Sequence, residues 1–211
     1  MTRLRGDRFA AVLAVLLFWA GVFGAGALVD GYSAREDYIS SLASRGSPVA
    51  VLGICALLAN AAAHLITARA VLKTGNTRLL ASFLLAAGVA TAVVALFRAS
   101  CPDGPAGCGL TETSTGDWID LVHGVSVGIY ELFTLAAMLT IGIGALRRTS
   151  RWPRWLGPVS VAFAIGSVLL IGQTEGDQIG LWQRSWLANN LAWLLVVAWV
   201  STVRDRAVTS P

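Results

Sequence analysis

The chain has few of the residue types on which soluble enzymes depend. Charged residues make up 13% of its 211 residues, against about 25% in a typical soluble domain. The sequence contains no Walker loop, H-E-x-x-H or C-x-x-C-H motif, which argues against the enzyme classes that those motifs define. The two histidines, His64 and His123, lie at different expected depths, and this excludes a histidine-rich zinc site.

Long apolar stretches dominate what is present, and 55% of the residues are hydrophobic. A bilayer core of about 30 Å is crossed by a helix of about 20 apolar residues. We therefore predict an all-α membrane helix bundle, a single domain over residues 1–211, with six transmembrane helices. The predicted helices are residues 9–29, 48–70, 79–98, 120–146, 156–173 and 184–203. The first apolar run is longer than the core of a signal peptide, about 7–15 residues, so we expect a retained helix although Ala25-Gly26-Ala27 resembles a cleavage site.

Basic residues divide unequally between the two sides that this topology creates. Cytoplasmic loops of membrane proteins are enriched in Lys and Arg, so we predict that both termini are cytoplasmic and that acidic loops face outward from the plasma membrane. The net charge of +4 then reflects orientation and not nucleic-acid binding. We expect membrane lipids as partners and leave a protein partner or a homo-oligomer open. The basic residues of the predicted cytoplasmic side are Arg3, Arg5, Arg8, Arg69, Lys73, Arg78, Arg147, Arg148, Arg151, Arg154, Arg204 and Arg206.

The three cysteines fall into two groups. Cys101 and Cys108 flank a Pro- and Gly-rich loop on the predicted outer side, where disulfides persist, so we predict a disulfide between them. Metal binding or redox catalysis by this pair is the alternative. Cys55 lies within the second predicted helix, where we expect a small apolar core residue.

Polar side chains gather at the predicted outer ends of the helices. Residues 30–47 mix hydroxyls, charges and aromatics, which is typical either of a solvated interfacial helix or of a cap over a pocket. Asp117, Asp120 and His123 begin the fourth helix, and residues three apart share a helix face. A carboxylate beside an imidazole suits general acid/base catalysis. A water-exposed helix end or part of a metal site are the alternatives.

Glu131 is an ionisable residue in the middle of a predicted transmembrane helix. It lies eleven positions beyond Asp120, about 16 Å deeper at 1.5 Å per residue. A charge at this depth costs about 2.5–3.5 kcal/mol, so the side chain should face the bundle interior or be protonated, in a functional or a structural role. Asn60 has a matching depth, and we predict that the second and fourth helices touch through Asn60 and Glu131.

Arg98 and Arg184 run against the charge bias, because they lie on the predicted outer side. Each could form an ion pair with Asp117, Asp120, Glu175 or Asp177, or bind an anionic headgroup through its guanidinium fork. We expect no cofactor and no metal. The candidate catalytic residues are Asp120, His123 and Glu131, and the candidate substrate-binding residues are Arg35, Asp37, Ser40, Asn60, Arg98, Asp117, Asp177, Gln183 and Arg184.

Three short motifs resemble one protein family. They are the run from Tyr32 to Ala43, Cys101-Pro102 followed by His123, and Gly180-Leu181-Trp182-Gln183-Arg184. The chain resembles the bacterial six-helix membrane proteins of unknown function catalogued as domain of unknown function 998. The resemblance implies a six-helix topology and a likely site but no established reaction. The family's first motif usually has an acid where this chain has Ser41.

Three hypotheses for function follow from these patterns. The leading one is an outward-facing polar pocket that binds or modifies a lipid or isoprenoid substrate. The second is a non-catalytic membrane scaffold or accessory subunit. A small-solute transporter is the third, and the lack of evident repeats and of broken helices in matching halves weighs against it.

Overall fold

Six α-helices and one short 3-10 helix make up the described part of the chain, without a strand in it. The computed structural model describes residues 2–73, 78–100, 118–147, 152–174 and 177–208. The elements are α1 (Thr2–Gly26), η1 (Ile39–Ala43), α2 (Ala50–Lys73), α3 (Arg78–Leu96), α4 (Trp118–Leu146), α5 (Leu156–Ile171) and α6 (Ile179–Val208). The predicted all-α fold is confirmed.

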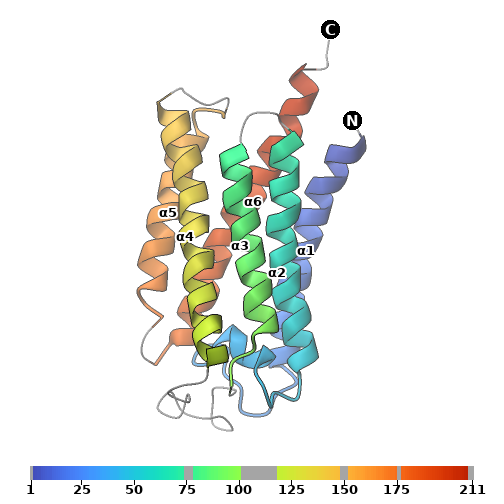
Figure 1. Cartoon of the computed structure of the whole chain (residues 1–211), viewed down its shortest axis with the longest axis vertical. Coiled ribbons are helices and arrows are strands. Elements are labelled where there is room, and N and C mark those ends of the chain that lie inside the picture. Colours follow the sequence, from blue (N-terminus) through green and yellow to red (C-terminus); the bar gives the residue numbers. More distant parts are fainter. Residues whose placement is uncertain (1, 74–77, 101–117, 148–151, 175–176, 209–211) are drawn as a thin grey trace.

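The helices stand side by side as an elongated bundle (Figure 1). Both termini lie at one end, here called the terminal end, and η1 lies at the other, here called the cap end. Neighbours in the sequence are neighbours in space, and α1 also packs against α6, so the bundle closes on itself. Contacts between α2 and α6 fill its centre.

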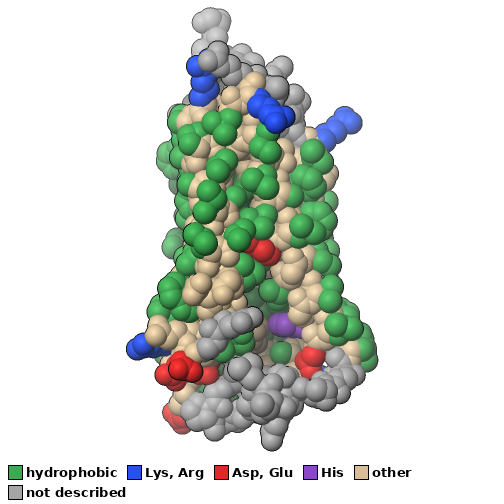
Figure 2. All heavy atoms as spheres, turned by 90° about the vertical axis from the view of Figure 1, so that its left-hand side faces the viewer, with side chains coloured by type: hydrophobic (Ala, Val, Ile, Leu, Met, Phe, Trp, Pro, Cys, Tyr) green, Lys and Arg blue, Asp and Glu red, His purple; other side chains and the backbone are tan. Residues whose placement is uncertain are grey.

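Four helices of the described chain are long and apolar enough to cross a membrane. They are Gly6–Gly26 within α1, Ala50–Lys73, Arg78–Leu96 and Trp118–Leu146, while α5 is a shorter apolar helix. Figure 2 shows the corresponding surface on one face, with apolar side chains over the middle, basic ones at the terminal end and mainly acidic ones at the cap end. The chain is therefore a multi-pass membrane protein.

The helix boundaries differ from the predicted ones mainly in α1 and α6. α1 begins at Thr2 and not at residue 9, and α6 runs from Ile179 to Val208 and not over 184–203. Backbone hydrogen bonds continue a helix through polar residues beyond its apolar run. Hydropathy therefore predicts which residues could lie in the membrane, but it does not predict where each helix begins and ends.

Small residues allow close helix contacts at two places. A Cβ atom at Gly21 would lie 2.8 Å from the Cβ of Ala56 on α2, and one at Gly142 would lie 2.9 Å from Val161 on α5. At Gly124 and Gly128 on α4 a Cβ would meet nothing within 4 Å among the described residues.

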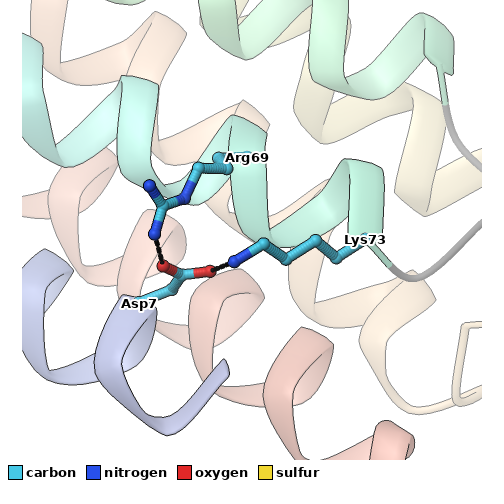
Figure 3. Close-up of polar contacts among 3 residues, drawn as sticks. All are labelled: Asp7, Arg69 and Lys73. Atoms are coloured by element: carbon cyan, nitrogen blue, oxygen red, sulfur yellow. Dashed lines mark hydrogen bonds and ion pairs between the residues drawn. The ribbon is translucent and has the colours of Figure 1, made fainter. Parts of the chain in front are cut away.

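One buried acid links α1 to α2 near the terminal end (Figure 3). Asp7 is only 2% exposed and accepts hydrogen bonds from Arg69 and from Lys73, the latter at 2.5 Å. The sequence analysis missed this pairing, because 62 positions separate Asp7 from Arg69. The three residues fasten the first helix to the bundle.

Replacing Asp7 with asparagine should weaken this contact. The asparagine side chain is neutral and cannot form the two ion pairs. Arg69 is 66% exposed, however, and can be hydrated instead. We expect a loss of about 1–2 kcal/mol in the free energy of unfolding. Unfolding of the purified variant in detergent measures the loss, and wild-type stability would show that the ion pairs contribute nothing.

Candidate functional site

Residues 30–47 fold over one end of the bundle and are called the cap from here on. Asp37, Ile39 and Ser44 are at most 3% exposed, and η1 runs through the middle of the segment. Gly31 and Gly46 have φ angles of 78° and 92°, a region that glycine enters without strain. The cap is therefore buried mainly over residues 37–44, and the described segment forms turns and a 3-10 helix in place of one interfacial α-helix.

Arg98, just beyond α3, holds the second half of the cap. Its Nε donates to Ala43 O at 2.8 Å and its Nη2 to Ser44 O at 2.6 Å. The backbone N–H of Arg45 donates to Ala99 O at 2.8 Å. These bonds satisfy cap carbonyls that no regular helix or sheet would satisfy.

Arg184, in the first turns of α6, holds the first half of the cap. It is 7% exposed. Its Nη1 donates to Asp37 O and to Gly180 O, each at 2.9 Å, and its Nη2 donates to the Tyr32 hydroxyl. Within the described residues both arginines therefore bind neutral oxygens and form none of the predicted ion pairs. Asp117 and Glu175 lie outside the described residues.

Other contacts complete the attachment of the cap. Gln183 Oε1 accepts a hydrogen bond of 2.6 Å from the Ile39 N–H, and Tyr38 donates through its hydroxyl to Thr174 O at 3.1 Å. Arg35 is exposed and contributes its carbonyl, which accepts from the Leu181 N–H at 2.9 Å. Asp177 is exposed as well.

Asp120 and His123 bind the residues that follow α3. Asp120 accepts hydrogen bonds from the Ser100 N–H, at 2.7 Å, and from the Ser100 hydroxyl. His123 Nδ1 lies 2.8 Å from Phe97 O and so carries the hydrogen of that bond. The two side chains thus use these atoms to hold α4 against the end of α3. The predicted disulfide partners Cys101 and Cys108 lie outside the described residues.

A small cavity lies between the cap and the core of the bundle. Its volume is about 40 Å³, enough for about three water molecules. Three of the predicted substrate-binding residues, Ser40, Asn60 and Gln183, line it. The full lining is Ile39, Ser40, Leu57, Asn60, Thr91, Val94, Val127, Tyr130, Gln183, Trp186 and Leu187.

Residues in and beside the lining of this cavity carry buried polar atoms without a hydrogen-bond partner. Asn60 Oδ1 and the Tyr130 hydroxyl, both on lining residues, have no hydrogen-bond partner in the described protein. His64 lies one turn from Asn60, with its ring 5.3 Å from that of Tyr130. Its Nδ1 is 3.1 Å from Asn60 O, so Nε2, also without a partner, is an acceptor. An unsatisfied buried polar group costs about 1–3 kcal/mol, which makes these atoms candidates for ligand binding.

Glu131 belongs to a second polar cluster, which joins α4, α5 and α6. Its Oε1 lies 2.8 Å from Ser167 Oγ, and its Oε2 accepts from Trp186 Nε1 at 3.0 Å and from Asn190 Nδ2 at 3.2 Å. Glu131 is 6% exposed. Trp186 also lines the cavity, so its indole ring lies between the cavity and the carboxyl group.

Counting hydrogens indicates that Glu131 is a neutral carboxylic acid. Ser167 has one hydroxyl hydrogen, yet its Oγ lies 2.8 Å from Glu131 Oε1 and 2.7 Å from Asn190 Oδ1. The orientation of the Asn190 amide follows from its neighbours, since Asn189 Nδ2 donates to Oδ1 at 3.3 Å. Ser167 can therefore donate to only one acceptor. A hydrogen on Glu131 Oε1 supplies the other bond.

The predicted contact between Asn60 and Glu131 is wrong. The hydrogen-bond partners of Glu131 lie on α5 and α6, whereas Asn60 lines the cavity. Tyr130, one residue earlier on α4, makes the contact with α2 through His64. Successive helix residues point about 100° apart, so a predicted depth does not say which of them faces a given neighbour.

Several residues of the two clusters were not predicted as site residues. Trp186 is only 3% exposed. Three polar residues within apolar runs are completely buried, namely Ser167, Asn190 and His64. Polar residues at the depth of Glu131 were the signal that could have identified Ser167 and Asn190. No group of three or more His, Cys, Asp or Glu side chains suited to a metal ion occurs among the described residues.

Together the apolar helices, the cap and the small cavity beneath it define a multi-pass, all-α membrane protein. The family model described as "Protein of unknown function (DUF998)" matches residues 12–200. The chain belongs to this family, as its three motifs predicted. No curated protein and no solved structure matches the chain.

Proposed function

We propose that the protein binds one lipid or isoprenoid molecule, with the polar end of that molecule in the cavity beneath the cap. The observation that supports this most directly is the set of unpartnered polar atoms of Asn60 and Tyr130, enclosed within an apolar bundle. A buried polar group without a partner lowers stability. Binding of a polar group at this place offsets that cost.

The size of the cavity supports an amphipathic ligand. Pockets that enclose a drug-sized molecule measure about 300–1,000 Å³, whereas this cavity measures about 40 Å³. Only a small group fits inside, so the remainder of the ligand lies outside the cavity. Exposed apolar side chains cover the bundle there, Leu121 at 67% and Val125 at 52% among them, and a hydrocarbon chain suits that surface.

The proposal includes the orientation of the protein in the plasma membrane. Six spans with both termini in the cytoplasm place the cap end outside, and the distribution of Lys and Arg supports this. The cavity then opens toward the outer half of the bilayer. A cysteine introduced at exposed Asp177 should react with an impermeant thiol reagent in whole cells, and protection until lysis would contradict the orientation.

The geometry favours binding over chemical modification of the ligand. Asp120 and His123, the residues predicted for acid/base catalysis, hold Ser100 and Phe97, and neither lines the cavity. Glu131 is separated from the cavity by Trp186 and takes part in a closed set of hydrogen bonds. We therefore propose a lipid carrier or receptor.

Replacing Asn60 with leucine tests the proposal. Leucine has a similar volume and removes the unpartnered Oδ1, so we expect unchanged or slightly higher stability, by up to about 1 kcal/mol. We also expect loss of the bound lipid. A ligand site that sacrifices stability in this way is a known pattern.

Comparative lipid mass spectrometry on a deletion strain provides the readout. Wild-type protein should restore a lipid species that the Asn60→Leu variant, expressed to the same level, does not restore. A Leu58→Ile variant is a matched control, since Leu58 lies on the same helix and is 38% exposed. Full restoration by Asn60→Leu, or a marked loss of its stability, would support a structural role for Asn60 and contradict the proposal.

A further inference from the structure

One face of α4 changes its surroundings along the length of the helix. Gly142 is in close contact with Val161 of α5. Gly124 lies 18 residues, or five turns, earlier on the same face, and there a Cβ would meet nothing within 4 Å. The same is true of Gly128. α5 thus covers this face of α4 toward the terminal end and leaves it open toward the cap end.

The open face adjoins the cavity. Val127, which lies between Gly124 and Gly128 in sequence, lines the cavity. Figure 2 shows the molecule from the side on which α4 and α5 lie, and its lower part is hollowed below an apolar surface. Acidic and histidine side chains border the hollow. Two glycines therefore flank a side-on approach to the polar atoms.

We propose that the ligand is a neutral lipid with a free hydroxyl group, such as a diacylglycerol or a long-chain alcohol, and that it enters sideways from the bilayer past Gly124 and Gly128. This inference rests on the proposed function, which names a lipid but neither its polar group nor its route. The hydrocarbon chain stays in the membrane along α4, and the hydroxyl group reaches the cavity.

The chemistry of the cavity selects the hydroxyl group. A hydroxyl both donates and accepts, so it can donate to Asn60 Oδ1 and accept from the Tyr130 hydroxyl, the two unpartnered atoms of the lining. None of the lining residues is charged. Arg98 and Arg184, the nearest candidates for an anion, donate to cap oxygens. A phosphate would be buried there without a counter-charge, which is costly.

The experiment uses photoreactive lipids and the full chain in nanodiscs. The first probe is a diacylglycerol with a diazirine in one acyl chain, and the second is the phosphatidic acid with the same two chains. Labelled peptides are identified by mass spectrometry, with unlabelled 1,2-dioleoylglycerol as competitor. We expect competed labelling of α4 and α2 peptides by the diacylglycerol, and labelling by the phosphatidic acid that is about tenfold weaker.

A Gly128→Leu variant tests the route. A Cβ there meets no atom of the described residues within 4 Å, so the variant should fold normally while the leucine side chain occupies part of the open face of α4. Gly24→Leu on α1 is the matched control, because a Cβ there also meets nothing within 4 Å. We expect Gly128→Leu to lower the competed labelling about tenfold and Gly24→Leu to leave it unchanged.

Each contrary outcome has a separate meaning. Equal labelling by the two probes overturns the hydroxyl preference and leaves the proposed function standing. Wild-type labelling of Gly128→Leu overturns the route. Absence of competed labelling by both probes overturns this inference, and the Asn60→Leu lipid comparison then decides the proposed function. Loss of a bound protein partner from Gly128→Leu, seen in native mass spectrometry, identifies the glycine face as a helix-docking surface and also overturns the inference.

Discussion

Replacing Glu131 with glutamine should leave the stability of the protein close to that of the wild type, whereas replacing it with methionine should lower it. A neutral carboxylic acid donates from one oxygen and accepts at the other, and a glutamine amide does the same. The bonds with Ser167, Trp186 and Asn190 therefore survive in Glu131→Gln. In Glu131→Met they are lost without a large change in volume.

The expected loss in Glu131→Met is about 2–3 kcal/mol. Hydrogen bonds within membrane proteins contribute about 0.6 kcal/mol on average, and the buried Trp186 and Asn190 donors are left unsatisfied as well. Reversible unfolding of the three proteins in the same detergent measures the difference. Infrared spectroscopy should show the carbonyl band of a protonated acid in the wild type that is missing from Glu131→Gln.

An ionised Glu131 would give the opposite pattern. Glutamine would then replace a charged acceptor with a group that has one acceptor atom, and Glu131→Gln would be destabilised about as much as Glu131→Met. A stable Glu131→Gln variant that loses its lipid would instead assign Glu131 a role in function beyond its hydrogen bonds.

Replacing Gly180 with alanine should displace the cap. A Cβ at this position would lie 2.3 Å from Asp37 O, 2.8 Å from Arg184 Nη1 and 2.9 Å from Ala34 O. Two of these atoms belong to the cap backbone and cannot move alone. We expect a loss of about 3 kcal/mol, at the upper end for overpacked sites, and faster hydrogen exchange of residues 34–44.

Gly24→Ala is the matched control for this variant. A Cβ at Gly24 meets nothing within 4 Å, and alanine within a helix is more favourable than glycine by about 0.5–1 kcal/mol. Gly24→Ala should therefore be as stable as the wild type or slightly more so. If Gly180→Ala shows wild-type stability and exchange, the cap is not fastened to α6 in the way described.

The architecture could be predicted from the sequence because a bilayer imposes a length on apolar helices. All six predicted helices correspond to helices of the structure. The positions of Arg98 and Arg184 against the charge bias also pointed to special roles. Their partners could not be predicted, because the acceptors are carbonyl groups of Asp37, Ala43 and Ser44, and backbone acceptors leave no mark in a sequence.

The composition of the site was predictable only in part. Ser40, Asn60 and Gln183 were predicted as binding residues and line the cavity, although the sequence placed Asn60 deeper in the membrane than the other two. The partners of Glu131 were not predicted, because they depend on how each helix is rotated about its axis. Asp120 and His123 were grouped correctly by spacing, but hydrogen bonds with Ser100 and Phe97 became visible only in the fold.

The central claim is that the cavity beneath the cap holds the polar end of one lipid. Native mass spectrometry tests it most directly, on wild-type protein and Asn60→Leu released from membranes in native nanodiscs. We predict one bound neutral lipid on the wild type and its loss from a folded Asn60→Leu variant. A lipid-free wild type, or the same lipid bound equally to both proteins, would contradict the account.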